Sequence, residues 1–221
     1  KTKTLSAGAV RFRPTGGDTT ARIDTWTARM MMESKSEVAQ CMMLAWSEAD
    51  FFASGPVLVS IAEELQASAV PVDLLIHSFT LTGLAMLVSE RCQVPMAGFI
   101  LQPSSIPSAD KDWKCVGLLE GGEPALLKRL KLSDKLNVSG RFSEQFTSHE
   151  MLGRMKSFAE SNPFSAYNLP RLRKDFGLKR ADTWKTLLGQ NIPMVIPMMP
   201  STFARPSDWP DRVKLTDFIF L

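Results

Sequence analysis

Three side chains are candidates for a general base, a group that accepts the proton of an attacking hydroxyl. Asp18 closes the segment TGGD after a predicted strand, and His77 closes the apolar strand VDLLIH. Both residues therefore fall at the carboxyl ends of strands, where α/β proteins bind their ligands. Asp73 begins the strand that His77 ends, so it falls at the opposite edge and is interpreted as structural.

Asp18 and His77 also have structural interpretations, and we favour these. An aspartate in a glycine-containing turn commonly bonds to its own backbone, which would account for Asp18. A lone histidine on a buried strand is more often a hydrogen-bonded core residue than a catalytic one. From the sequence alone, both residues are therefore candidates for the general base, and neither is assigned that role.

The residues that directly follow the two central predicted strands are candidates for lining a substrate crevice. They are Ser78, Phe79, Gln102, Pro103 and Ser104. Phe79 could form an apolar cleft with the Met- and Trp-rich segment 26–52, because ligand clefts are mostly apolar. Those methionines could equally seal the sheet, and the sequence favours neither interpretation.

The sequence predicts no metal site and no cofactor-binding site. Cys41, Cys92 and Cys115 share no CxxC spacing and are odd in number, which suits a reducing, intracellular compartment. Two separated histidines, His77 and His149, are too few for a zinc site. Neither a GxxxxGKS or GxxxxGKT loop nor a GxGxxG loop occurs, so no phosphate cradle is expected.

The composition is ordinary for a globular domain. The chain has 221 residues, of which 44% are hydrophobic and 22% charged, with a formal net charge of +3. That charge is too small to indicate a nucleic-acid partner. The basic runs at 127–131 and 171–180 are interpreted as solvated helix faces. No apolar run reaches the roughly 20 residues needed to span a bilayer, so no transmembrane segment is expected.

Apolar runs alternate with helical periodicity, which predicts a single α/β domain over residues 1–221. A strand, a helix and a strand follow one another within residues 72–101, and this βαβ pattern indicates a parallel sheet. We expect a largely parallel, Rossmann-like sheet with helices on both faces. The predicted strands are 10–13, 72–77, 95–101, 193–198 and 213–221, and the predicted helices fall within 21–53, 56–68, 81–92, 123–136 and 148–178.

Several segments, taken in order, resemble the amino-terminal half of sterol 3-β-glucosyltransferases and their relatives among the two-domain GT-B UDP-glycosyltransferases. The segment LSAGAVRFRPTGGD is similar to the family's strand that runs into a GGDP-like loop. VDLLIHSFTLTGLAMLVSERCQVPMAGFILQPSSIPS resembles its strand–helix–strand unit, and YNLPRLRKDFGL resembles a later helix. FARPSDWPDRVKLTDFIFL resembles the stretch before the interdomain linker, in which Arg205, Asp208 and Trp209 are interpreted as architectural.

The resemblance implies an acceptor-binding domain that acts on a sterol or another lipid-like molecule, peripheral to a membrane. In the family, a glycine loop precedes the equivalent of Lys1, and a second domain that binds the UDP-sugar follows the equivalent of Leu221. The chain by itself is therefore expected to lack sugar-transfer activity. The alternative is a catalytically degenerate GT-B-like domain that serves as a structural or interaction subunit of a larger assembly. A third interpretation is a small-molecule binding module without turnover.

Overall fold

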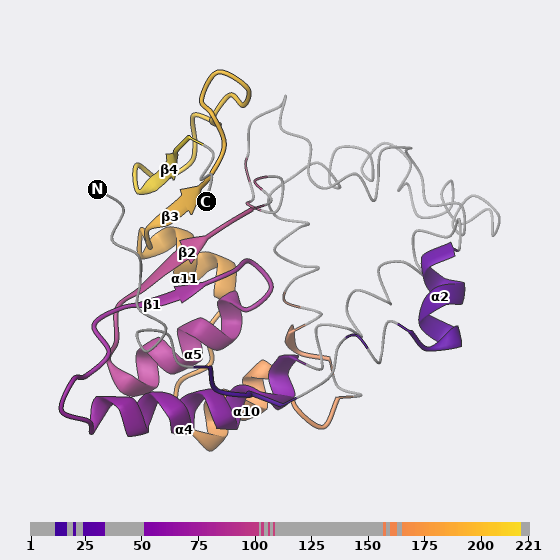
Figure 1. Cartoon of the computed structure of the whole chain (residues 1–221), viewed down its shortest axis with the longest axis vertical. Helices are drawn as coiled ribbons and strands as arrows, with labels where there is room; N and C mark the ends of the chain where they lie inside the picture. Colours follow the sequence, from indigo (N-terminus) through magenta and orange to yellow (C-terminus); the bar gives the residue numbers. More distant parts are fainter. Residues whose placement is uncertain are drawn as a thin grey trace.

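Four short parallel strands form the sheet of this protein in the computed structural model (Figure 1). The structure describes residues 12–16, 20, 24–33, 51–101, 103, 106, 108, 157, 160–162 and 165–217. The strands are β1 (Leu75–His77), β2 (Met96–Phe99), β3 (Met194–Ile196) and β4 (Val213–Leu215). The described helices are α2 (Trp26–Glu33), α4 (Gly55–Gln66), α5 (Thr82–Cys92), α10 (Leu169–Asp175) and α11 (Thr183–Gly189).

The strand order is β1-β2-β3-β4, and every neighbouring pair is parallel. In the register, His77 lies opposite Gly98, Gly98 opposite Met194, and Met194 opposite Val213. Aligned residues of adjacent strands point to the same side of a sheet, so these four share one face. The predicted α/β class and parallel sheet are confirmed, although each strand is shorter than the sequence indicated.

The inner face of the sheet is the face covered by helices. Side chains of α5 and α11 pack on it in a single apolar cluster. The cluster comprises Ala85, Met86, Met96, Ile100, Ile106, Leu187, Ile192, Met194, Ile196, Trp209 and Val213. Helix α5 is buried without interruption from Thr82 to Val88, because it lies between the sheet and a further layer of helices.

Helices α4 and α10 form that further layer on the far side of α5. Val59 of α4 and Leu172 of α10 pack with Leu84 and Leu87 of α5 in a second apolar cluster. Helix α4 begins at the Gly55–Pro56 pair, where proline suits the first turn. The Asn168 side chain caps α10 by accepting a hydrogen bond from the Arg171 N–H at 3.0 Å.

One predicted strand is absent from the structure in the described part of the chain. Phe12 and Arg13 are not in a strand, although 10–13 was expected to join the sheet. Arg13 instead forms an ion pair with Glu64 of α4 at 2.8 Å, and Pro14 and the positive φ of Gly16 (80°) turn the chain. Within 21–53, where helix was expected, the described helical residues are α2, which Thr25 caps through the Ala28 N–H, and residues 51–53, while residues 34–50 lie outside the described residues.

The pattern in 148–178 predicts helix interrupted at Asn162–Pro163, and the described residues agree, whereas Pro170, expected as a second interruption, lies in the first turn of α10. Its described part contains α10, and residues 165–167 that precede this helix are not helical. Asn168 is extended at the cap, so the helix cannot continue backwards through it. The helix expected at 123–136 and the last residues of the strand expected at 213–221 lie outside the described residues.

Candidate functional site

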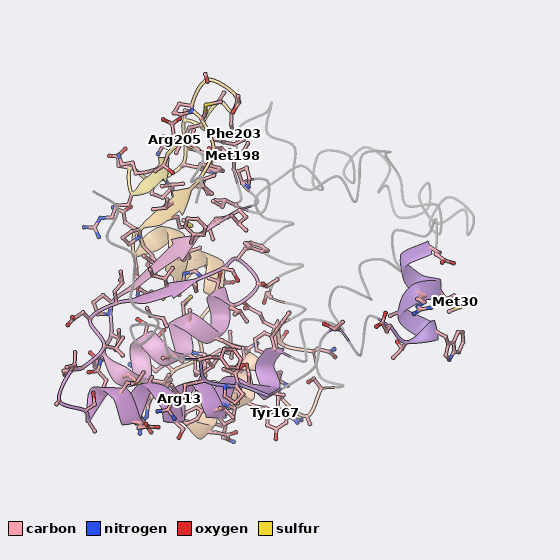
Figure 2. All side chains as sticks on the ribbon, in the orientation of Figure 1. Arg13, Met30, Tyr167, Met198, Phe203 and Arg205 are labelled. Atoms are coloured by element: carbon pink, nitrogen blue, oxygen red, sulfur yellow. The ribbon has the colours of Figure 1, made fainter. Side chains whose placement is uncertain are left out.

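The carboxyl edge of the sheet is the candidate site, because all four strands point their carboxyl ends towards it. Residues 78–81 leave β1 there, and Leu101 and Pro103 follow β2 at the same edge. Since β1 pairs directly with β2, these two loops are neighbours. The edge is continued by the loop 197–212 between β3 and β4, where Figure 2 shows Met198, Phe203 and Arg205 gathered.

His77 is at the end of β1 and is only 5% exposed. Its Nδ1 lies 2.9 Å from the carbonyl oxygen of Ser78, a distance at which an Nδ1–H donates to that oxygen. Nε2 then carries the ring's lone pair, and this atom is buried with no hydrogen-bond partner among the described residues. Burial lowers the pKa of His77 below its usual value, which the hydrogen bond to Ser78 opposes in part.

This geometry matches the core interpretation of His77 more closely than the catalytic one. A neutral imidazole with a free Nε2 is chemically able to accept a proton. However, Nε2 faces the interior, and Gly98 on β2 leaves space there: a Cβ at Gly98 would lie 3.4 Å from the His77 Cε1 atom. A substrate hydroxyl could reach Nε2 only if neighbouring groups moved.

The turn after β1 is held by Thr82, the first residue of α5. The Thr82 hydroxyl donates to the Phe79 carbonyl at 2.6 Å, and its oxygen lies 3.4 Å from His77 Nδ1. Ser78 is exposed, whereas Phe79 is half-buried and packs against the inner-face cluster. Of the predicted crevice residues in this turn, Ser78 therefore faces solvent and Phe79 contributes mainly to packing.

The loops after β2 and β3 are joined by a hydrogen bond across the edge. The buried Ser108 hydroxyl donates to Asp208 Oδ1 at 2.6 Å, and Pro103 lies half-buried in the same loop as Ser108. Arg205 donates to the carbonyl oxygens of Val213, Pro206, Trp209 and Pro210. Trp209 is 3% exposed and its ring centroid lies 5.9 Å from that of Phe203, which confirms its predicted packing role.

Glu160 is a buried carboxylate at this end of the molecule that the sequence did not single out. It is 4% exposed, and its Oε2 accepts a hydrogen bond from the Thr183 hydroxyl at 2.5 Å. A Cβ added at Gly83, in the first turn of α5, would lie 2.7 Å from Glu160 Oε1. A carboxylate is electrostatically favoured beside a helix N-terminus, so Glu160 stabilises the start of α5. Its contacts with Gly83 and Thr183 are both tertiary, so no local motif encodes them.

Three of the predicted site residues, Asp18, Gln102 and Ser104, lie outside the described residues. Asp73 is exposed just before β1, at the amino end of the strand, as expected from the sequence. Within the described ranges no group of three or more acidic, histidine or cysteine side chains could hold a metal ion. The same ranges contain no helix with the length and apolarity to cross a bilayer.

Comparison with known proteins gives no relative for this chain. No protein-family model matches it, and neither the curated proteins nor the solved structures include a match.

Proposed function

We propose that this chain is the acceptor-binding half of a two-domain, UDP-sugar-dependent glycosyltransferase with a sterol or another lipid-like acceptor. The observation that supports it is the paired edge of β1 and β2, where the two strands of the resembling strand–helix–strand segment end side by side. Parallel α/β sheets bind ligands at such edges. The UDP-sugar belongs to a second domain in this proposal.

The acceptor would lie against the turns after β1 and β2, with Ser78, Phe79 and Pro103 as described contacts. Ser78 offers an exposed hydroxyl, and Phe79 and Pro103 offer half-buried apolar surface. The base that accepts the acceptor's proton is Asp18 or His77. Because His77 Nε2 is buried, its use would require local opening, so the proposal places more weight on Asp18.

The first test measures acceptor and donor binding separately on the isolated chain. A fluorescent sterol analogue in detergent is titrated against the chain, and UDP-glucose is titrated by calorimetry. We expect saturable sterol binding that Ser78→Trp weakens, and no micromolar binding of UDP-glucose. Val70→Trp is the matched control, because Val70 is 80% exposed and lies before β1 at the other edge.

Two results would remove this proposal. One is micromolar UDP-glucose binding by the isolated chain, and the other is sterol binding that is absent or equally affected by both tryptophan substitutions. For the catalytic residues, the complete two-domain protein carrying Asp18→Asn or His77→Gln is assayed for sugar transfer. A loss of kcat with unchanged sterol affinity identifies the base.

A second candidate function is an interaction subunit of a larger assembly. It is favoured by a specific observation, the apolar side chains on the sheet face that α4, α5, α10 and α11 do not cover. Ile76 on that face is 67% exposed. An exposed apolar sheet face commonly marks a contact with another protein or another part of the chain.

A further inference from the structure

The segment 169–183 folds back on itself beside α5, and we call it the basic hairpin. Its end is tied to a buried carboxylate near the start of α5, because the Thr183 hydroxyl donates to Glu160 Oε2 at 2.5 Å. Helix α10 begins at the same place, since its first residue lies against the same turn of α5. Farther along, the Arg173 side chain donates to the Lys179 carbonyl at 2.6 Å. Helix α10 and the chain that returns from it therefore lie side by side.

Basic side chains gather on this hairpin and in the first turn of α11. Between residues 171 and 185 six basic residues occur with two acidic ones. One of the six, Arg173, is buried and bonded to Glu90. The other five are exposed, and within the described residues no carboxylate forms an ion pair with them. We call these five the basic surface: Arg171, Lys174, Lys179, Arg180 and Lys185.

Three exposed arginines outside the hairpin show a different arrangement, because each is paired with a carboxylate. The pairs are Arg13–Glu64, Arg29–Asp24 and Arg91–Glu63. On the hairpin, one of the two acidic side chains is already used locally: Asp182 accepts the Lys185 N–H at 2.9 Å and so caps α11. An excess of one sign of charge on one surface attracts a partner of the opposite sign. The basic surface therefore suits an anionic partner.

We propose that the basic surface binds the anionic headgroups of a membrane. Leu169 and Leu172 of α10 are buried in the second apolar cluster, so the hairpin presents charge and not an apolar face that could insert. Cations spread over an exposed surface suit a bilayer, whose negative charge is spread over a plane and attracts each basic side chain. Tyr167, directly before α10, is 45% exposed, and tyrosine suits the depth of the headgroups (Figure 2). The proposal does not depend on the glycosyltransferase function.

A nucleic acid is the other common polyanion, and the basic surface suits it less well. Proteins that bind single strands place several aromatic side chains among the basic ones, and successive bases stack on them. In the described part of the chain around the hairpin, Tyr167 is the one exposed aromatic side chain, because Phe176 packs against the second apolar cluster. The formal net charge of +3 is also small for a nucleic-acid-binding protein.

Vesicle co-sedimentation with the whole chain tests the proposal. Two kinds of sterol-free vesicle are compared, phosphatidylcholine alone and phosphatidylcholine with about one-third phosphatidylserine. We expect saturable binding to the anionic vesicles, about tenfold or more tighter than to the neutral ones. Lys174→Glu combined with Arg180→Glu should weaken binding to the anionic vesicles by about tenfold or more, because two attractions become repulsions. Since the vesicles contain no sterol, the result is independent of acceptor binding.

The matched control combines Arg212→Glu with Lys214→Glu, at and before β4. These two residues are also exposed, and their reversal changes the net charge of the chain by the same amount. Binding to the anionic vesicles should fall by about twofold at most, because a charge that lies away from the contact is screened by salt. An equal loss in the two double variants would overturn the proposal, since net charge alone would then explain the binding.

Two further outcomes of this experiment would also overturn the proposal. One is binding to the neutral vesicles that is as tight as binding to the anionic ones. The other is displacement from the anionic vesicles by an equimolar mixed-sequence single-stranded oligonucleotide, which would assign the basic surface to a nucleic acid instead.

Salt gives a second measurement that needs no substitution, so a folding defect in a variant cannot obscure it. Raising the ionic strength from about 0.1 M to about 1 M shortens the Debye length from about 10 Å to about 3 Å. The native chain should then leave the anionic vesicles. Binding that is unchanged by salt would show that the contact is apolar, and would contradict a role for the basic surface.

Discussion

The two faces of the sheet differ in how they are packed. On the inner face Met194 and Ile196 are 1% and 0% exposed, beneath α5 and α11. On the outer face, which is the opposite one, the neighbouring Val195 is only half-buried and Ile76 is 67% exposed. Yet the strands have apolar side chains on both faces, as strands covered on both faces do. The strand sequences therefore indicate a sheet covered on both faces, and the described helices cover only the inner one.

This difference places the stability of the described fold in the layers on the inner face. Packing there is tight: a Cβ at Gly55 would lie 2.8 Å from Leu172 Cδ1, and one at Gly98 would lie 3.0 Å from Met194 Cγ. Where side chains are packed to this density, removed atoms leave cavities that cannot collapse fully. Substitutions on the inner side should thus cost much more than matched substitutions at exposed positions.

The largest effect is expected for Ile196→Ala in the centre of the inner-face cluster. Loss of a fully buried Ile side chain, together with the cavity that remains, should lower the free energy of unfolding by about 2–5 kcal/mol. Val70→Ala, at a position that is 80% exposed, should change it by less than about 0.5 kcal/mol. Urea denaturation measures both. Similar values for the two variants would show that the inner face is not the main core.

Arg173→Ala tests how α10 is held on α5. Arg173 is 3% exposed, donates two hydrogen bonds to the Glu90 carboxylate at 2.6 and 3.0 Å, and donates a third to the Lys179 carbonyl. Because the Glu90 side chain is 36% exposed and can be rehydrated, we expect a loss of about 1–3 kcal/mol, less than for a fully buried pair.

The exposed ion pair between Arg91 and Glu63 is the matched control for Arg173. Its side chains are 45% and 47% exposed, so Arg91→Ala should cost less than about 1 kcal/mol. Thermal unfolding of both variants gives the comparison. An Arg91→Ala effect as large as that of Arg173→Ala would count against burial as the source of the difference.

Gly83→Ala tests the tight contact at the start of α5. The new Cβ would lie 2.7 Å from Glu160 Oε1 and 2.9 Å from Leu169 Cδ2, so these groups must shift. We expect a net loss of about 1–2 kcal/mol after the gain in helix propensity. At Gly189, at the end of α11, nothing lies within 4 Å, so Gly189→Ala should be neutral or stabilising by up to about 1 kcal/mol. Stabilisation by both alanines would contradict the crowding at Gly83.

The fold could be predicted from the sequence where several local signals agreed. The apolar runs around Leu75–His77 and Met96–Phe99, with a helical pattern between them, sufficed for a parallel βαβ unit. The strand predicted at 10–13 was wrong because alternation over four residues is a weak signal. Pro14 and the ion pair of Arg13 with Glu64 both oppose pairing of this segment with the sheet. Such a tertiary charge contact has no local signature.

The position of the candidate site at the carboxyl edge of the sheet could be predicted from the sequence, but the orientation and contacts of its side chains could not. The rule that parallel strands present their carboxyl ends together placed Ser78 and Pro103 at neighbouring positions. The sequence could not decide whether the His77 ring faces solvent or core, because that depends on the space left by Gly98 in the next strand. For the same reason Glu160, which meets Gly83 and Thr183 only in the folded chain, was missed.

The smallest expected effect is a pH dependence of stability that comes from His77, at the inner face. Burial lowers the pKa of the folded-state imidazole below the ordinary value of 6.5, so the unfolded chain binds the proton more readily. Stability from this group is then complete above pH 6.5 and falls as the pH drops below that value.

Urea midpoints at pH 7.5 and 5.5 should therefore decrease more steeply with acid for the native chain than for His77→Gln, whatever the stability of the variant at neutral pH. Since His149 is present in both proteins, only the difference between the two slopes reports on His77. Parallel slopes would mean that the imidazole is protonated without cost in the folded state, and hence that solvent reaches Nε2. That outcome would revive the catalytic interpretation of His77 and weaken the contrast between a sealed inner face and an open outer one.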